Sequence, residues 1–269
     1  MSTSAKVTAR QRIENLLDDN SFVEIGAYVK ARNTDFNIQA KDTPSDGVIT
    51  GYGVINGGLV YVYSQDASVL GGSVGEMHAK KIASLYDMAM KTGSPVIGLI
   101  DSTGLRLQES VDGLNAFGQI YMKQSLASGV IPTVTAIFGN CGGGLSIVAG
   151  LSDFTFMEVE NAQLFVNSPN AITENRKEIC DNASAKFQSE EAGNVDFVGT
   201  EAEVIEGIRN LVSVLPSNNE DEASDLECYD DLNRAAEGIE NCGEDTLLAL
   251  ENIISASFFL SISPVSSTI

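Results

Sequence analysis

The stretch GNCGGGLSIVAGLSDFTFM, residues 139–157, decides the fold and the site expected from this chain. The apolar run before it, residues 131–138, is typical of a buried strand, and four glycines follow within six positions. A short apolar helix and a second β-rich run come next. Glycines between a strand and a helix let a ligand approach the backbone, and the N–H groups at the helix N-terminus can stabilise an oxyanion. The sequence therefore predicts a site made of backbone.

Two more loops of unusual composition follow predicted strands. The sequence DASVLGGSVG, residues 66–75, leads into a long amphipathic helix over residues 76–92. The sequence DSTGLRLQES, residues 101–110, follows a buried strand. We name these the GGS loop and the DSTG loop, and we name residues 139–144 the CGGG loop. Because ligands of α/β folds bind at the C-terminal ends of strands, we expect the DSTG and CGGG loops to converge on one site.

Strands, helices and glycine-rich or polar loops alternate along the chain, which indicates an α/β fold. The clearest turn is Asn56-Gly57, in a hairpin predicted over residues 47–63. The other predicted elements are helices at 8–17, 115–128 and 200–215 and strands at 21–25, 96–100, 154–159 and 163–166. After about residue 180 the pattern weakens, with an acidic linker at 217–231 and a last amphipathic helix at 244–255.

The composition argues against several classes of function. The chain has 269 residues and a net charge of -21, from 16 Lys and Arg against 37 Asp and Glu, which disfavours nucleic acid or an anionic membrane as partner. No apolar run reaches the length of a membrane helix and no signal core is visible, so we expect a cytoplasmic protein. One histidine and four widely spaced cysteines predict neither a metal site nor a disulfide framework.

Side-chain nucleophiles are not favoured by the sequence. Cys141 lies within the CGGG loop, and we interpret it as a small buried residue. Ser146 lacks the G-x-S-x-G spacing of a nucleophile elbow. His78 is interpreted as a packing or helix-surface residue.

Five segments, in the expected order, resemble the N-terminal half of biotin-dependent carboxyltransferases. This family includes acyl-CoA carboxylase β subunits and methylmalonyl-CoA and glutaconyl-CoA decarboxylase α subunits. The segments are ARQRIENLLDDNSFVEI, DGVITGYGVINGGLVYVYSQDASVLGGSVGEMHAKKI, SPVIGLIDSTGLRLQES, SGVIPTVTAIFGNCGGGLSIVAGLSDFTFM and the weaker NSPNAI. The resemblance covers most of residues 8–234. It implies a crotonase-like fold, a spiral of repeated β-β-α units, and an acyl-CoA thioester as substrate.

The family's reaction moves a carboxyl group between biotin and the α-carbon of the acyl-CoA through an enolate-like oxygen. That oxygen needs fixed hydrogen-bond donors. By resemblance, the catalytic residues are Gly142, Gly143 and Gly144, of which Gly143 and Gly144 are the best candidates for backbone N–H donors and Gly142 is adjacent. The alternative interpretation is that these glycines only permit close packing of helix and strand.

The resemblance also indicates where the substrate is bound. The candidate substrate-binding residues are Gly71, Gly72, Ser73, Lys80, Asp101, Arg106 and Gln108. The GGS-loop residues would lie beside the acyl-CoA or its pantetheine arm, with a simple turn before the helix as the alternative. The two basic residues, together with Lys81, would meet CoA phosphates, with a solvated helix surface as the alternative for the lysines. The aspartate and the glutamine would instead orient the DSTG loop by hydrogen bonds.

The resemblance implies partners as well. The biotin would be carried by a biotin carboxyl carrier protein. CYDDLNRAAEGIE resembles the linker between the two halves of full-length members, and DTLLALENIISASFFLSIS resembles the start of the second half. We therefore expect a carboxyltransferase N-terminal domain at 1–216 and an acidic linker with the start of a second half at 217–269. Either a separate chain would supply the C-terminal half, which implies a hetero-oligomer, or this chain is a fragment.

Three departures from the family's pattern are visible. Gly142 stands where the family has alanine, and Thr103 and Leu105 replace a glycine and an alanine of the DSTG loop. Residues 181–194 replace a segment that usually bears glycine and histidine. Two alternatives therefore stay open: a stand-alone crotonase-type hydratase or isomerase, which needs paired acids and has Glu109 as one, and a non-catalytic scaffold half.

Overall fold

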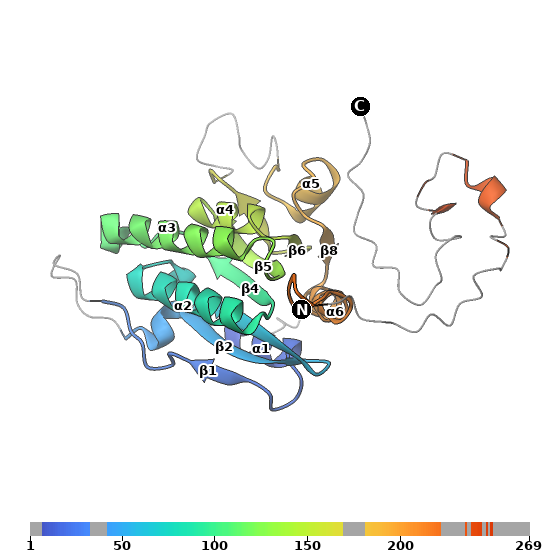
Figure 1. Ribbon diagram of the computed structural model, residues 1–269. Helices are drawn as coiled ribbons and strands as arrows, with labels where there is room; N and C mark the ends of the chain where they lie inside the picture. Colours follow the sequence, from blue (N-terminus) through green and yellow to red (C-terminus); the bar gives the residue numbers. More distant parts are fainter. Residues whose placement is uncertain are drawn as a thin grey trace.

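The fold is built on one mixed sheet (Figure 1). The computed structural model describes residues 7–32, 42–168 and 181–221, with positions 235, 238–243, 246, 248 and 249. In these ranges the sheet has eight strands in the order β1-β2-β3-β4-β5-β6-β8, and β7 pairs with the end of β5. The strands are β1 (Val23–Ile25), β2 (Val48–Ile55), β3 (Gly58–Gln65), β4 (Val96–Ser102), β5 (Thr133–Gly142), β6 (Phe154–Glu158), β7 (Gln163–Phe165) and β8 (Phe197–Gly199).

Strand directions divide the sheet into two parts. The pairs β1–β2 and β2–β3 are antiparallel, and every later pairing is parallel. The helices are α1 (Ala9–Leu16), α2 (Glu76–Thr92), α3 (Ser110–Ala127), α4 (Gly144–Gly150), α5 (Ala185–Glu190) and α6 (Glu201–Val214). The expected β-β-α unit is clearest in β2, β3 and α2. The predicted α/β class is thereby confirmed.

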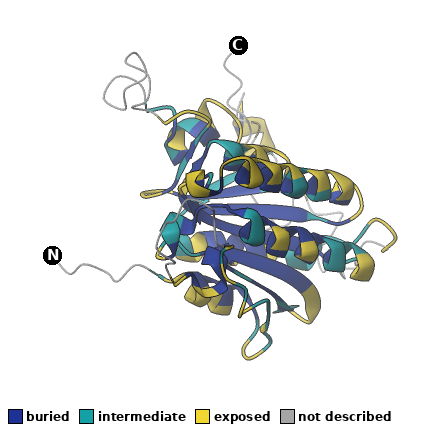
Figure 2. Cartoon of the chain, turned by 90° about the vertical axis from the view of Figure 1, so that its left-hand side faces the viewer, coloured by how far each residue is buried: buried dark blue, intermediate teal, exposed yellow. Residues whose placement is uncertain are grey.

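Helices cover both faces of the sheet, so the core has two parts. One joins α2, α3 and α4 to one face, and the other joins α1 and α6 to the opposite face. Alternate residues of each strand serve the two faces: Tyr61 and Tyr63 belong to the first core, and Val60 and Val62 to the second. Figure 2 shows the buried strands as a dark blue layer and the outer sides of the helices in yellow.

Local signals explain most of the element boundaries. Thr8 begins α1 with a capping box, and Thr200 does the same for α6. Gly93 ends α2 in the left-handed conformation. The hairpin turns at Asn56 and Gly57, both with positive φ, as predicted.

Two predicted boundaries are wrong by four or five residues. The second long helix starts at Ser110 rather than at residue 115, and its early Gly113 lies where a Cβ would approach Leu105 to 2.9 Å. The Asp-Gly pair that resembles a loop thus permits a close contact inside the helix. The strand of the opening stretch runs to Gly142 rather than to residue 138, because β7 pairs with its last residues.

Two segments after β7 make hydrogen bonds that attach them to the body of the domain. Residues 181–194, which depart from the family's pattern, include α5, and Gln188 Nε2 donates to the carbonyls of Leu164 and Asn182. After α6, the Asn218 amide donates to the Gly93 carbonyl and the Asn219 N–H to the Val130 carbonyl, both at 3.0 Å. The chain is thus held at the N-terminal ends of β4 and β5.

The predicted boundary at residue 216 stays a prediction. Most of the linker at 217–231 and most of the helix at 244–255 lie outside the described residues. None of the helices in the described ranges is long and apolar enough to cross a membrane.

Candidate active site

The three loops named from the sequence meet at the C-terminal ends of β3, β4 and β5, which are adjacent and parallel. The GGS and DSTG loops are joined through their backbones. Thr103 N–H donates to the Gly71 carbonyl at 2.9 Å, and Val74 N–H donates to the Gly104 carbonyl at 2.8 Å. These two loops therefore form one unit.

The DSTG and CGGG loops are also in contact, as predicted. Ser102 of β4 pairs with Cys141 of β5 after an irregularity in the register. Gly104 has a φ of +93°, and a Cβ at this position would approach the Gly142 carbonyl oxygen to 3.2 Å. Both the backbone conformation and the close approach require glycine here.

The GGS loop lies directly against the DSTG loop. Gly72 has a φ of +64°, and an added Cβ would overlap the carbonyl oxygen of Asp101. An added Cβ at Gly71 would approach the Thr103 side chain to 3.0 Å. Ser73 is buried, and its hydroxyl and carbonyl both accept from the DSTG-loop arginine. These three residues therefore pack the GGS loop against the DSTG loop. Direct contact with a ligand stays a prediction for each of them.

The CGGG loop uses its glycines in three different ways. Gly142 ends β5, and a Cβ there would approach the Phe165 ring to 2.5 Å. Gly143 has φ +61° and ψ −125°, a conformation that is accessible to glycine. Gly144 is the first residue of α4, and its carbonyl accepts from the Tyr121 hydroxyl at 2.6 Å.

The expected donor role does not fit Gly143 in this conformation. Its N–H already donates to the Phe165 carbonyl at 3.0 Å. The N–H groups of Gly144 and Leu145 lie in the first turn of α4, where the helix itself offers no acceptor carbonyl. These two groups are the better candidates for an oxyanion, and the Leu145 N–H has no signature in the sequence.

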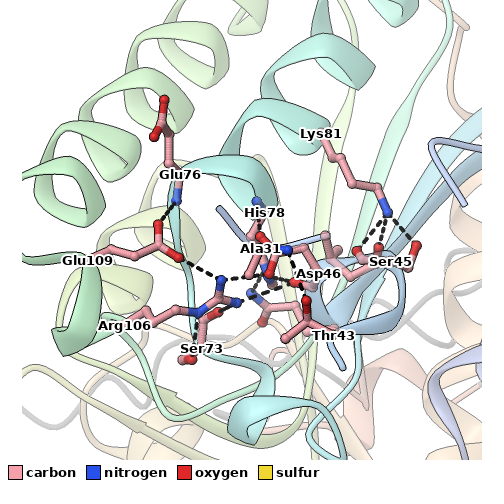
Figure 3. A network of polar contacts seen from close by, with 12 residues as sticks. Ala31, Thr43, Ser45, Asp46, Ser73, Glu76, His78, Lys81, Arg106 and Glu109 are labelled. Atoms are coloured by element: carbon pink, nitrogen blue, oxygen red, sulfur yellow. Dashed lines mark hydrogen bonds and ion pairs between the residues drawn. The ribbon is translucent and has the colours of Figure 1, made fainter. Parts of the chain in front are cut away.

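A buried ionic network joins residues of the GGS and DSTG loops to Asp46 (Figure 3). Arg106 is 3% exposed, and its Nη1 lies 2.6 Å from Asp46 Oδ1 and 2.9 Å from Glu109 Oε1. Its Nη2 donates to the Ser73 carbonyl at 2.7 Å. Burial raises the pKa of Asp46, and the nearby guanidinium opposes this shift.

The same two carboxylates cap α2. Asp46 Oδ2 accepts from the N–H of His78 at 2.8 Å, and Glu109 Oε2 accepts from the N–H of Glu76 at 2.6 Å. The helix's own N-cap is Gly75, which has no side chain for this purpose. Negative charge at a helix N-terminus is stabilising, so the network satisfies α2 with groups from elsewhere in the chain.

His78 is a buried structural residue. Its Nδ1 lies 3.0 Å from the Asp46 carbonyl and its Nε2 lies 3.1 Å from Gln65 Nε2. A carbonyl only accepts, so this arrangement assigns the proton to Nδ1 and leaves Nε2 to accept from the Gln65 amide. Burial, assisted by the charge of Arg106, lowers the pKa of His78 to about 3. The packing interpretation of His78 thus fits, whereas a helix-surface position does not.

Lys81 is buried as well, which corrects its expected contact with a CoA phosphate. Its Nζ donates to the hydroxyl of Ser45 at 2.5 Å and to the carbonyls of Ser45 and Val48. Burial lowers the pKa of Lys81 to about 8. It secures the turn that carries Asp46.

The remaining predicted substrate-binding residues lie in different environments. Lys80 is half-exposed and pairs with Glu76 at 2.7 Å, so a phosphate contact for it stays a prediction. Gln108 is exposed beside the other DSTG-loop residues. Asp101 is buried and pairs with Arg12 at 3.3 Å, which fits the interpretation that it orients the loop.

The two candidate nucleophiles are Cys141, which is buried, and Ser146, whose hydroxyl is hydrogen-bonded. Cys141 is buried, and burial raises the pKa of its thiol to about 12, so the reactive thiolate is disfavoured. The Ser146 hydroxyl donates to the Gly143 carbonyl at 2.7 Å.

Two residues that make buried ion pairs at the site, Asp46 and Arg12, were not predicted from the sequence. The signal of Asp46 in the sequence is the Asp-Gly pair that it forms with Gly47. Arg12 lies next to Ile13 on the apolar side of the first predicted helix. A cation among apolar neighbours is the signal that could have identified a buried ion pair.

Comparisons with known proteins identify the family of the chain. The family model described as Carboxyl transferase domain matches residues 2–248. The methylmalonyl-CoA decarboxylase subunit alpha of Propionigenium modestum is 44% identical over 234 residues, 86% of this chain and 45% of that protein. The propionyl-CoA carboxylase beta chain of Roseobacter denitrificans is 40% identical over 233 residues, 85% of this chain and 46% of that protein.

A solved structure gives the same result. Transcarboxylase 12S, determined with methylmalonyl-CoA and methylmalonic acid bound, matches with a TM-score of 0.81 at 36% identity, over 87% of this chain and 46% of that chain. Fold and loops thus define a crotonase-like α/β domain, as predicted. The chain belongs to the carboxyl transferase domain family, which confirms the resemblance. It spans somewhat less than half of these relatives.

Proposed function

We propose that this chain is the N-terminal half of a biotin-dependent carboxyltransferase that acts on an acyl-CoA. The contact of three glycine-bearing loops at the C-terminal ends of β3, β4 and β5 carries the proposal, because this edge is where α/β sheets bind ligands. The acyl-CoA names of its relatives support the substrate class.

In this proposal the carboxyl group moves between biotin and the α-carbon of the acyl-CoA. The acyl-CoA passes through an enolate, whose thioester oxygen carries the negative charge in either direction. The N–H groups of Gly144 and Leu145 would hold that oxygen, and Gly142 and Gly143 would set the turn before them. One well-placed donor of this kind is worth roughly 3–4 kcal/mol.

No side-chain base is required, because loss of carbon dioxide from the biotin carboxyl group can generate the base. This fits a site whose titratable neighbours are already engaged. Glu109, the acid that a hydratase or isomerase would need, is buried and bonded to Arg106 and to the N–H of Glu76. The geometry therefore favours the carboxyltransferase over that alternative.

The proposal includes partners. A biotin carboxyl carrier protein would deliver the carboxyl group, and a C-terminal-half carboxyltransferase chain would complete a hetero-oligomer. The names of the relatives as subunits and chains of decarboxylases and carboxylases support an assembly of this kind. A cytoplasmic location, as expected from the sequence, is part of the proposal.

The test is calorimetric titration of the full chain with propionyl-CoA and malonyl-CoA. The variant is Gly143→Ala, and its matched control is Gly129→Ala. Both glycines have positive φ and open space where a Cβ would be, but Gly129 lies before β5 at the other end of the sheet. Binding that Gly143→Ala loses and Gly129→Ala keeps would support the proposal.

Two outcomes would contradict the proposal. A folded chain that binds neither thioester, alone or with a C-terminal-half chain, would indicate the scaffold. Turnover of crotonyl-CoA without biotin would indicate the hydratase.

A further inference from the structure

We infer that Arg106 is a positioning residue of the acyl-CoA site, holding the DSTG loop to the GGS loop through Ser73 and to the turn that carries Asp46. The inference rests on the proposed function, and it corrects the phosphate contact expected for Arg106 from the sequence. A residue that binds a phosphate must be accessible to the ligand, whereas the side chain of Arg106 is buried.

The guanidinium bonds in three directions. Its Nε donates to the Ser73 hydroxyl at 3.3 Å, and its Nη2 donates to the Ser73 carbonyl at 2.7 Å and the Asp46 carbonyl at 3.4 Å. Its Nη1 serves both carboxylates, Asp46 at 2.6 Å and Glu109 at 2.9 Å. A planar fork can join three chain segments in this way, and the single ammonium group of a lysine cannot.

Each carboxylate also accepts a hydrogen bond from an N–H group at the N-terminus of α2. Asp46 caps the N–H of His78, and Glu109 caps the N–H of Glu76. A Cβ at Gly75 would overlap Glu109 Oε1 and would lie 2.5 Å from Arg106 Nη1, so the backbone packs directly on the ion pairs. The N-terminus of α2 is therefore occupied by carboxylates of the chain itself.

The backbone of Arg106 connects the network to the site. Its N–H donates to the Val74 carbonyl at 2.9 Å, and the Val74 N–H donates to the carbonyl of Gly104, which contacts the CGGG loop. Without the guanidinium, two buried carboxylates would face each other across the gap, with Lys81 as the neighbouring cation on the Asp46 side. An uncompensated buried charge is strongly unfavourable, so the loops would separate.

The first measurement is hydrogen exchange of Arg106→Lys and Arg106→Gln. The matched control is Arg209→Gln, which removes an arginine that bonds to Leu16, Asp18 and Asn56 at the other end of the sheet. We expect amides in residues 69–75 and 101–110 to exchange about tenfold faster in both Arg106 variants and to be unchanged in the control. Wild-type exchange in folded Arg106→Lys would overturn the inference.

The second measurement compares propionyl-CoA with free CoA by calorimetry. Positioning predicts that the variants lose about tenfold in affinity for propionyl-CoA at low and high salt, with little change for CoA. A phosphate contact would instead weaken both ligands together, and the loss would shrink at high salt, which would overturn the inference. If the wild type binds neither ligand, the proposed function fails for the isolated chain, and the exchange measurement still decides the role of Arg106.

Discussion

Arg12, in α1, pairs with Asp101, the first residue of the DSTG loop, with 3.3 Å between Nη1 and Oδ2. Its Nε pairs with Glu201 of α6 at 2.8 Å, and its guanidinium lies 4.6 Å from the centre of the Phe138 ring. The Asp101 carboxylate fills the space beside Gly139, where a Cβ would overlap it. The DSTG loop is thus fixed by Arg12 at Asp101 and, through its own Arg106, at Asp46.

Replacing Arg12 should destabilise the fold. Arg12→Met leaves the Asp101 carboxylate buried without this cation, and we expect the free energy of unfolding to fall by about 3 kcal/mol. The control is Arg10→Met, two residues earlier, which removes a half-exposed pair with Glu24 and should cost less than about 1 kcal/mol. Urea unfolding measures both, and equal losses would contradict the assignment.

His78 makes stability depend on pH. Its pKa is about 3 in the folded chain against an ordinary value of 6.5, so between these values the unfolded chain binds a proton that the folded chain does not. The free energy of unfolding therefore falls as the pH is lowered through this window, with a limiting slope of about 1.4 kcal/mol per pH unit. The sequence has a single histidine, so His78→Gln removes this contribution from both states.

The comparison is made by urea unfolding between about pH 5 and pH 7, above the range where most carboxylates titrate. The wild type should lose stability more steeply than His78→Gln, by about 1 kcal/mol per pH unit below about pH 6. Parallel curves would show that His78 titrates normally in the folded chain.

Gly72 should tolerate no side chain. In Gly72→Ala the new methyl group would overlap the Asp101 carbonyl, and the φ of +64° adds backbone strain. We expect a loss of about 2–3 kcal/mol in the free energy of unfolding, together with weaker acyl-CoA binding. Gly57→Ala, at a φ of +86° with nothing near its Cβ, reports the backbone contribution alone, about 1 kcal/mol. Equal effects would mean that the loops are not in tight contact.

Ser110 is strained where α3 begins. Its φ of 47° and ψ of −119° are unusual for a residue with a side chain, and Ser110 is exposed. Ser110→Gly should therefore raise the free energy of unfolding by about 1 kcal/mol, which thermal unfolding would detect. The control is Ser128→Gly, which follows the same helix at an ordinary φ of −56° and should be destabilising or neutral. A destabilised Ser110→Gly would show that the serine side chain supports the turn.

The sequence predicts elements better than it predicts partners. The hairpin, α2 and α6 match their predicted positions because periodicity, Asn-Gly and capping residues are local signals. The convergence of the DSTG and CGGG loops also follows from the strand order of α/β folds. The carboxylate partners of Arg106 could not be predicted. Asp46 lies 60 residues away in the sequence, and the two side chains come together only when the tertiary structure forms.

The error at Gly143 has a similar cause. A glycine next to a helix indicates free N–H groups at the helix N-terminus. Such an N–H can, however, donate to a carbonyl of a strand that comes later in the sequence. β7 does this through the Phe165 carbonyl, and the short run QLF carries little periodic signal of its own. The sequence thus located the glycine turn and could not assign its donors.

The anchoring of Asn218 and Asn219 at the starts of β4 and β5 holds the described residues 218–221 at the end of the sheet opposite the three loops. A strand of seven residues such as β4 spans roughly 23 Å, so residues 218–221 and the candidate acyl-CoA site lie about one strand length apart, at opposite ends of the sheet.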